Sequence, residues 1–395
     1  MTPEISRRSL LTGTAGLATL AAAVSPLVAA TAQTATVRRG PWDSDDVPAA
    51  SRSSRRMAAT AQEFLDTLST AQRAKTVYPR LGDAARTKWS NFPASFSPRA
   101  GISIAELTDA QRARMHELLR ASTSSQGYHK MTGAIRADDV LHDIEGGNAM
   151  FGAANYFVSV FGSPHDANWA WMLTGHHMTA IFTVAGDRTA FTPMFTGAQP
   201  LQIPTGLHAG WQVLPHDTQR AGELLASLSA DQQRVAVIGA AAPGDVLAGP
   251  GRQASLATFQ GIAAGRLGDG QQRLLWLLVQ EFVHNADTGA AEAQLALVKQ
   301  HWSDTHFSWQ GPSPDPAARY YFRVHGPRIL IEYDVQEPLT RNGGHVHAIT
   351  RDPANDYGMD WLGLHYQESS AMPNGPGGPG GPPNGPPGPP PHTHR

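Results

Sequence analysis

The 395-residue chain contains no cysteine. Disulfide bonds are therefore excluded, and any metal site has to be built from His, Asp, Glu or Met side chains. Charged residues are also scarce, at 16% of the chain, and the formal net charge is −2. No basic stripe stands out along the sequence. This balance argues against nucleic acid as the main partner.

Several catalytic signatures are absent as well. The chain has no Gly-X-Ser-X-Gly, no P-loop, no Gly-X-Gly-X-X-Gly leading into a helix and no His-Glu-X-X-His. A serine hydrolase, a nucleotide enzyme of the common folds and a zincin are therefore not indicated. The cupin pattern also fails, because the expected glutamate does not follow the His-Val-His of residues 345–347.

Residues 1–32 have the features of a twin-arginine signal peptide. The motif SRRSLL occupies residues 6–11, a mildly apolar stretch covers 13–28, and Ala-Thr-Ala at 30–32 offers a cleavage site. The stretch is short and weakly apolar for a membrane-spanning helix. We expect a periplasmic or extracellular protein that uses the Tat translocon during export and whose mature chain has no stable membrane insertion. Because this route carries folded cargo, often with its cofactor loaded, it favours a bound metal modestly.

Composition divides the rest of the chain. Residues 33–56 are polar and are expected to form a mobile lead-in, and residues 372–395 are almost entirely Pro and Gly, which predicts a disordered tail. The segments between them, 57–205 and 206–371, are predicted to be two copies of one unit.

Several motifs of the first segment recur in the second segment about 150 to 160 residues later, which indicates two copies. STAQR at 69–73 returns as SADQQR at 229–234, and LTDAQR at 107–112 returns as LGDGQQR at 267–273. Each carries a Gln three residues after the cap position, the pattern of a capping box, with Gly in place of the hydroxyl in the last copy. Leu-rich helical runs follow.

Each copy then changes to strand chemistry. Aromatic and β-branched residues fill 169–184 and 320–335, and each run is interrupted at a glycine, Gly175 or Gly326. Returning strands are expected near 189–196 and 345–350. Helices followed by antiparallel strands, twice over, predict an α+β fold of two hairpin-bearing lobes related by approximate two-fold symmetry.

The second hairpin differs from the first by a group of possible ligands. Side chains two apart in a strand share a face, so His345 projects with His347, and Glu332 projects with Asp334. The first copy supplies its own pair at the equivalent turn. These residues are His176 and His177.

Two imidazoles with a carboxylate suit one divalent transition metal: Zn, Cu, Fe or Mn, with the identity left open. We predict metal ligation by His345 and His347, assisted by His176 or His177; these two are adjacent, and only a bend beside Gly175 would admit both. The carboxylates Glu332 and Asp334 are predicted to act in catalysis or as a ligand. The alternatives are a hydrogen-bonded polar face for the histidines and a solvated strand face for the carboxylates.

The motifs around these residues carry a resemblance. These motifs are GHHM at 175–178, FTVAGD at 182–187, GPRILIEYD at 326–334, HVH at 345–347 and RD at 351–352. They resemble the bacterial and fungal family of exported proteins called domain of unknown function 3500. The resemblance covers about residues 58–366 and implies no activity. The Arg-Asn-Gly-Gly segment before His345 departs from the Asn-rich approach expected in that family.

We therefore expect an exported metal-dependent hydrolase or oxidase acting on an extracellular small molecule or polymer, with one carboxylate as general base. A non-catalytic ligand- or metal-binding protein is the alternative, and a structural surface protein comes third. The residues expected to contact substrate or ligand between the lobes are Trp169, Trp171 and Arg328.

Overall fold

The computed structural model describes residues 49–315 and 317–371. The predicted signal peptide at 1–32 and the Pro/Gly tail at 372–395 lie outside the described residues, as does most of the predicted lead-in. The end of that lead-in differs from expectation, because helix α1 (Ala49–Asp66) already begins at Ala49. The first ordered element therefore starts eight residues before the expected boundary at residue 57.

The helices begin where the capping motifs predict. Ser69, Thr108 and Ser229 each accept a hydrogen bond from the backbone of a Gln three residues on, and that Gln side chain bonds back to the cap. At the fourth position the N–H of Gly268 donates to Oε1 of Gln271 at 3.0 Å. The helices that follow α1 are α2 (Thr70–Thr76), α3 (Asp109–Ser122), α4 (Ser125–Ile144), α5 (Pro215–Ser227), α6 (Ala230–Ala236), α7 (Asp269–Val283), α8 (Thr288–Gln300) and α9 (Met359–Ala371).

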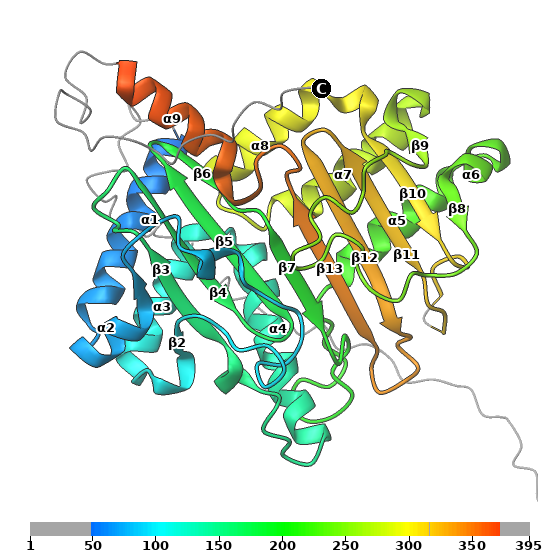
Figure 1. Ribbon diagram of the computed structural model, residues 1–395. Coiled ribbons are helices and arrows are strands. Elements are labelled where there is room, and N and C mark those ends of the chain that lie inside the picture. Colours follow the sequence, from blue (N-terminus) through cyan, green and yellow to red (C-terminus); the bar gives the residue numbers. More distant parts are fainter. Residues whose placement is uncertain (1–48, 316, 372–395) are drawn as a thin grey trace, which may run out of the picture. The chain divides into compact units, whose positions relative to one another are not determined.

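A single mixed sheet joins the two segments that were expected to form lobes (Figure 1). The strands in order are β1 (Val77–Tyr78), β3 (Phe157–Phe161), β4 (Asn168–Thr174), β5 (Met178–Ala185), β7 (Met194–Ala198), β13 (His345–Arg351), β12 (Ile329–Glu337), β11 (Tyr321–Gly326), β10 (His306–Gln310) and β8 (Val237–Gly239). The short strands β2 (Ile102–Ser103), β6 (Arg188–Ala190) and β9 (Ile262–Ala263) pair with β3, β5 and β10.

The predicted hairpins are present as β4–β5 and β11–β12, both antiparallel. The sheet is mixed because its outermost strands, β1 and β8, run parallel to β3 and β10. At its centre β7 pairs with β13, and His347 lies directly opposite Gly197 in that pairing. We call this central pairing the seam.

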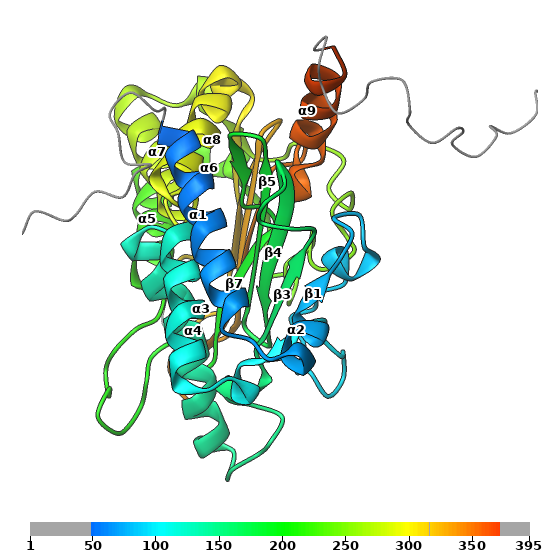
Figure 2. The same cartoon turned by 90° about the vertical axis from the view of Figure 1, so that its left-hand side faces the viewer.

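Helices α1, α3, α4, α5, α7 and α8 cover one face of the sheet (Figure 2). Their apolar sides and the facing strand residues form the larger core, which includes Trp169 and Trp171. The opposite face is covered by the loops at 79–101 and 240–261, which contribute Trp89 and Val246 to a smaller core with Phe195. Both faces are therefore buried. In the described part of the chain, no helix has the length and apolar character needed to cross a membrane.

Candidate metal centre

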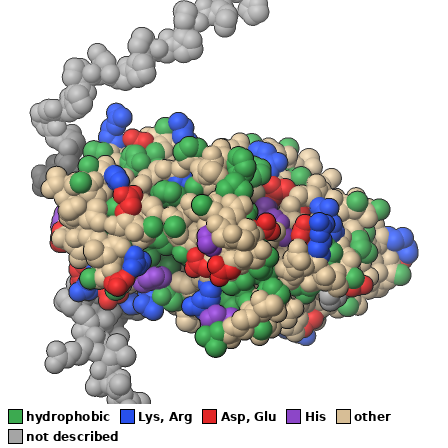
Figure 3. All heavy atoms as spheres, turned by 90° about the horizontal axis from the view of Figure 1, so that it is seen from below, with side chains coloured by type: hydrophobic (Ala, Val, Ile, Leu, Met, Phe, Trp, Pro, Cys, Tyr) green, Lys and Arg blue, Asp and Glu red, His purple; other side chains and the backbone are tan. Residues whose placement is uncertain are grey.

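Three histidines meet at the end of the sheet where β13 begins. His345 and His347 belong to β13, and His177 belongs to the turn between β4 and β5. Both β13 histidines lie on the loop-covered face, since residues two apart share a side of a strand. Seen from this end, histidine side chains reach the surface among acidic and hydrophobic ones (Figure 3).

The turn that carries His177 is fixed by glycine and by three backbone contacts. A Cβ on Gly175 would lie 2.3 Å from the ring of Tyr156, so only glycine fits there. The N–H of Gly175 donates to the carbonyl of Met178 at 2.8 Å. The N–H of His177 donates to the Tyr156 hydroxyl at 3.3 Å, and its carbonyl accepts from Gly197 at 2.6 Å. The imidazole is thus tied to the seam.

The three imidazoles direct their Nε2 atoms at one another. Nε2 of His345 lies 3.1 Å from Nε2 of His177 and 3.0 Å from Nε2 of His347. Gly197 makes room for this approach, because a Cβ there would lie 3.1 Å from Cδ2 of His177 and 3.2 Å from Cδ2 of His347. We call His177, His345 and His347 the imidazole cluster.

Carboxylates lie next to the Nδ1 atoms of two of these rings, on the side away from Nε2. Nδ1 of His347 lies 2.8 Å from Oδ1 of Asp245, which comes from the 240–261 loop. Nδ1 of His177 lies 3.6 Å from Oδ1 of Asp138 on α4. Asn91, from the other loop, places its amide nitrogen 3.4 Å from Nδ1 of His347. The carboxylates fix ring orientation and direct both Nε2 atoms toward His345.

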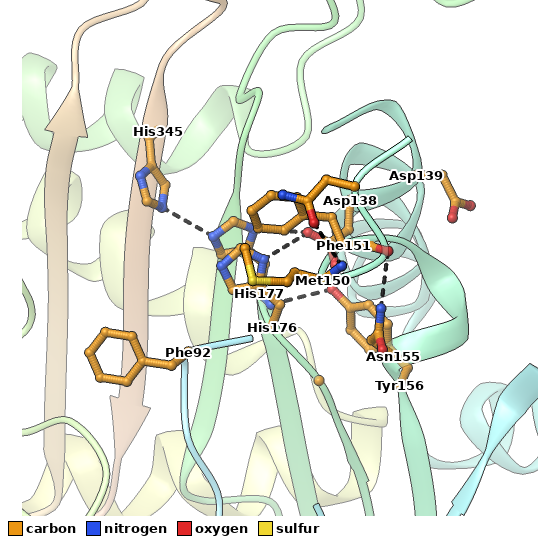
Figure 4. Close-up of polar contacts among 12 residues, drawn as sticks. Phe92, Asp138, Asp139, Met150, Phe151, Asn155, Tyr156, His176, His177 and His345 are labelled. Atoms are coloured by element: carbon orange, nitrogen blue, oxygen red, sulfur yellow. Dashed lines mark hydrogen bonds and ion pairs between the residues drawn. The ribbon is translucent and has the colours of Figure 1, made fainter. Parts of the chain in front are cut away.

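His176 lies next to the cluster without joining its Nε2 atoms. Its Nδ1 lies 2.8 Å from the same Oδ1 of Asp138, and its ring stacks on His177 with 3.6 Å between centroids (Figure 4). The bend expected beside Gly175 is therefore present, but it directs the two adjacent histidines to different places. Among the described residues, two groups could hold a metal ion: the imidazole cluster, and Asp138 with His176 and His177.

Burial sets the protonation of these groups. It lowers the pKa of His177 to about 3, with a further contribution from neighbouring His176. Burial and the two neighbouring imidazoles also lower the pKa of His345. Burial alone would raise the pKa of Asp138, but its hydrogen bond with His176 and the nearby ring of His177 hold the pKa below its usual range. Neutral imidazoles backed by an ionised carboxylate are the form that binds metal ions.

The two carboxylates expected to act in catalysis lie on the same face of β12. Glu332 accepts from the backbone of Leu247 at 2.8 Å and of Ala248 at 2.7 Å, and from the Tyr321 hydroxyl at 2.6 Å. It anchors the 240–261 loop. Asp334 lies opposite His347 in the strand pairing, and burial together with Asp245 raises its pKa to about 7.

The residues expected to contact substrate lie away from the cluster. Trp169 and Trp171 are 1% and 0% exposed in the larger core, and Nε1 of Trp171 donates to Oγ of Ser122 at 3.2 Å. Arg328 lies at the opposite end of β12 and forms an ion pair of 2.7 Å with Asp352. None of the three borders the imidazole cluster.

Sequence reasoning missed Asp138, Asp245 and Asn91. Asp138 carried a signal, because it lies three residues from Ile135 and from Leu141, among the buried residues of α4. A carboxylate on the apolar side of a helix requires a buried partner. Asp245 and Asn91 carried no comparable signal, since loops from different segments bring them to the site.

A family model described as "Protein of unknown function (DUF3500)" matches residues 50–359. No curated protein matches the chain. No solved structure matches it either.

Proposed function

The chain belongs to the family described as Protein of unknown function (DUF3500), and we propose that it is an exported metal-dependent enzyme whose imidazole cluster binds one divalent transition metal. The observation that carries this proposal is the approach of three Nε2 atoms at 3.0 and 3.1 Å. Hydrolysis is the reaction class we favour, and oxidation with dioxygen is the second candidate.

Hydrogen bonding alone does not satisfy this arrangement. Asp245 accepts a hydrogen bond from Nδ1 of His347, and Asp138 faces Nδ1 of His177. A neutral imidazole carries one N–H, so His347 presents a bare lone pair at Nε2, and His177 does the same when its proton is on Nδ1, toward Asp138. His345 has a single Nε2 proton at most and cannot fully satisfy both. A cation among the three nitrogens accepts all three lone pairs.

The donor set fits a transition metal. His177, His345 and His347 would hold the ion through three imidazole nitrogens that lie within 4.8 Å of one another. Neutral imidazoles suit Zn, Cu and Fe, and Mn is the least favoured of the four metals considered. Three protein ligands leave at least one coordination position open, which is the pattern of catalytic zinc sites.

When bound, such a metal lowers the pKa of water or polarises a substrate oxygen. The residues of the chain then have separable roles. Asp138 and Asp245 orient imidazoles, and Asp334, opposite His347, is the carboxyl group we assign to proton transfer. Glu332 is not assigned a catalytic role, because its oxygens are already engaged by two backbone amides and a hydroxyl.

The open position is also what favours an enzyme over a metal-storage or ligand-binding protein. A storage site would be closed by a fourth protein ligand. Metal identity bears on the choice between hydrolysis and oxidation with dioxygen. Zinc has no redox chemistry and would support hydrolysis, whereas iron or copper held by the same three imidazoles could also react with dioxygen.

We further infer that the two segments arose by duplication. Outward from the seam, each side has three antiparallel pairings in turn and then a parallel edge strand. The reciprocal side-chain amide bonds of Gln72 with Gln111 recur between Gln232 and Gln271. Export by the twin-arginine route rests on the SRRSLL motif at residues 6–11.

Elemental analysis of the purified, folded chain tests the metal centre. We expect about one equivalent of a transition metal, and its loss when His345 and His347 are both replaced by Ala. His142→Ala is the matched control, because His142 is a half-buried histidine of α4 paired with Asp143 and outside the imidazole cluster. Unchanged stoichiometry in the double variant would refute the assignment.

A further inference from the structure

We propose that the metal centre takes substrates that carry an aromatic or bulky aliphatic group, and that this group packs against Phe92. The inference rests on the proposed function and adds the substrate class to it. Two features of the described residues carry it: an exposed aromatic side chain on the loop that contacts His347, and an arginine that ties the backbone of this loop to the turn of His177.

Phe92 is an exposed aromatic residue at the site. It follows Asn91, whose amide contacts His347, and its side chain is 60% exposed. Figure 4 shows its ring and His345 to the left of His177, with Phe151 to the right. The ring centroid of Phe151 lies 5.3 Å from that of His176. Aromatic side chains therefore lie on both sides of His177 in this view.

Arg99 holds the loop of Phe92 in one place. Its guanidinium donates to the carbonyl of Ser90 at 2.7 Å, to the carbonyls of Phe92 and Ser97, and to the carbonyl of Gly175 at 3.4 Å. The last contact joins the loop to the turn that carries His177. A loop whose backbone is held in this way loses less conformational entropy when a ligand packs on it.

The test uses the cobalt(II)-loaded chain and two metal-binding probes, acetohydroxamic acid and benzohydroxamic acid. Each loses one proton and binds as a hydroxamate through the same two oxygens, and the two differ in a methyl against a phenyl group. Titration of the cobalt visible bands gives a dissociation constant for each. We expect benzohydroxamic acid to bind about tenfold more tightly, and Phe92→Ala to bring the ratio of the two constants close to one.

Two further variants complete the design. Phe92→Leu keeps an apolar side chain and should restore most of the preference. Phe96→Ala removes a ring of the same loop that is 72% exposed and should leave the ratio unchanged. A ratio near one in the unsubstituted chain, or a ratio that Phe92→Ala does not alter, would overturn the inference while leaving the metal centre intact. Absence of cobalt bands would instead refute the metal centre, and this inference with it.

Discussion

Replacing Asp138 with Asn removes the charge that orients two imidazoles. Asp138 is 0% exposed, and a single oxygen of its carboxylate lies 2.8 Å from Nδ1 of His176 and 3.6 Å from Nδ1 of His177. Asn has the same shape, so the packing of α4 is kept. Its amide oxygen can accept one of the two N–H groups, but its NH₂ group offers donors to rings that need acceptors.

The expected loss is in metal affinity. Carboxylates that hold metal-binding histidines contribute about 10–100-fold to affinity when mutated, or about 1.4–2.7 kcal/mol. We expect the lower half of this range, because the 3.6 Å contact to His177 is long for a hydrogen bond. The assay is competition for the metal against a chromophoric chelator, with urea denaturation of the metal-free chain to separate affinity from stability.

Asp139→Asn is the matched control for this change. Asp139 is the next residue of α4, accepts from the N–H of Ala153 at 2.6 Å and faces away from the cluster. Its substitution should leave the metal dissociation constant within about twofold of the unsubstituted value. Equal affinities in Asp138→Asn, Asp139→Asn and the unsubstituted chain would show that Asp138 does not orient a ligand.

Two other changes address the same region. The pKa of Asp334 is raised from 3.8 to about 7 in the folded chain, so its carboxyl group keeps a proton that the unfolded chain loses near pH 4. The free energy of unfolding therefore falls as pH rises from about 4 to 7, by at most roughly 4 kcal/mol. Asp334→Asn should therefore raise the free energy of unfolding at pH 8 and change it little at pH 4, since Asn can still accept from Gln336; equal effects at the two pH values would contradict this. Gly197→Ala places a Cβ about 3 Å from the rings of His177 and His347 and 2.8 Å from the backbone oxygen of Val346. We expect metal binding at least tenfold weaker in the chelator assay, together with a lower urea midpoint. Retention of full affinity would show that the two rings can move apart freely.

The sequence predicted the elements whose signals are local. Capping boxes at Ser69, Thr108 and Ser229 located helix starts, because a hydroxyl and a Gln at fixed spacing suffice to form them. Comparison of the two hairpins singled out His176, His177, His345 and His347, together with Glu332 and Asp334, because one segment has them and the other does not. Of these, His177, His345 and His347 bring their Nε2 atoms together.

Strand faces were harder to predict. Every residue of β5 is buried, as is nearly every residue of β4, because helices cover one face of the sheet and loops cover the other. Alternation of polar and apolar side chains therefore cannot distinguish the faces. Trp169 and Trp171 were expected to contact substrate between two lobes, and they lie on the helix-covered face in the larger core. The edge strands β1 and β8 are two and three residues long and carry no periodic signal.

The position of the imidazole cluster couples metal binding to assembly of the seam. His177 and His345 are 168 residues apart in the chain, and their Nε2 atoms meet only when β7 pairs with β13. The unfolded chain has no such preformed site, so the free energy of metal binding adds to the stability of the folded sheet. A metal that joins the two segments would then be bound once folding is complete. If the chain is exported by a route that carries folded proteins, the cytoplasm is where the metal would be acquired, and the metal present in that compartment would determine which reaction the three imidazoles support.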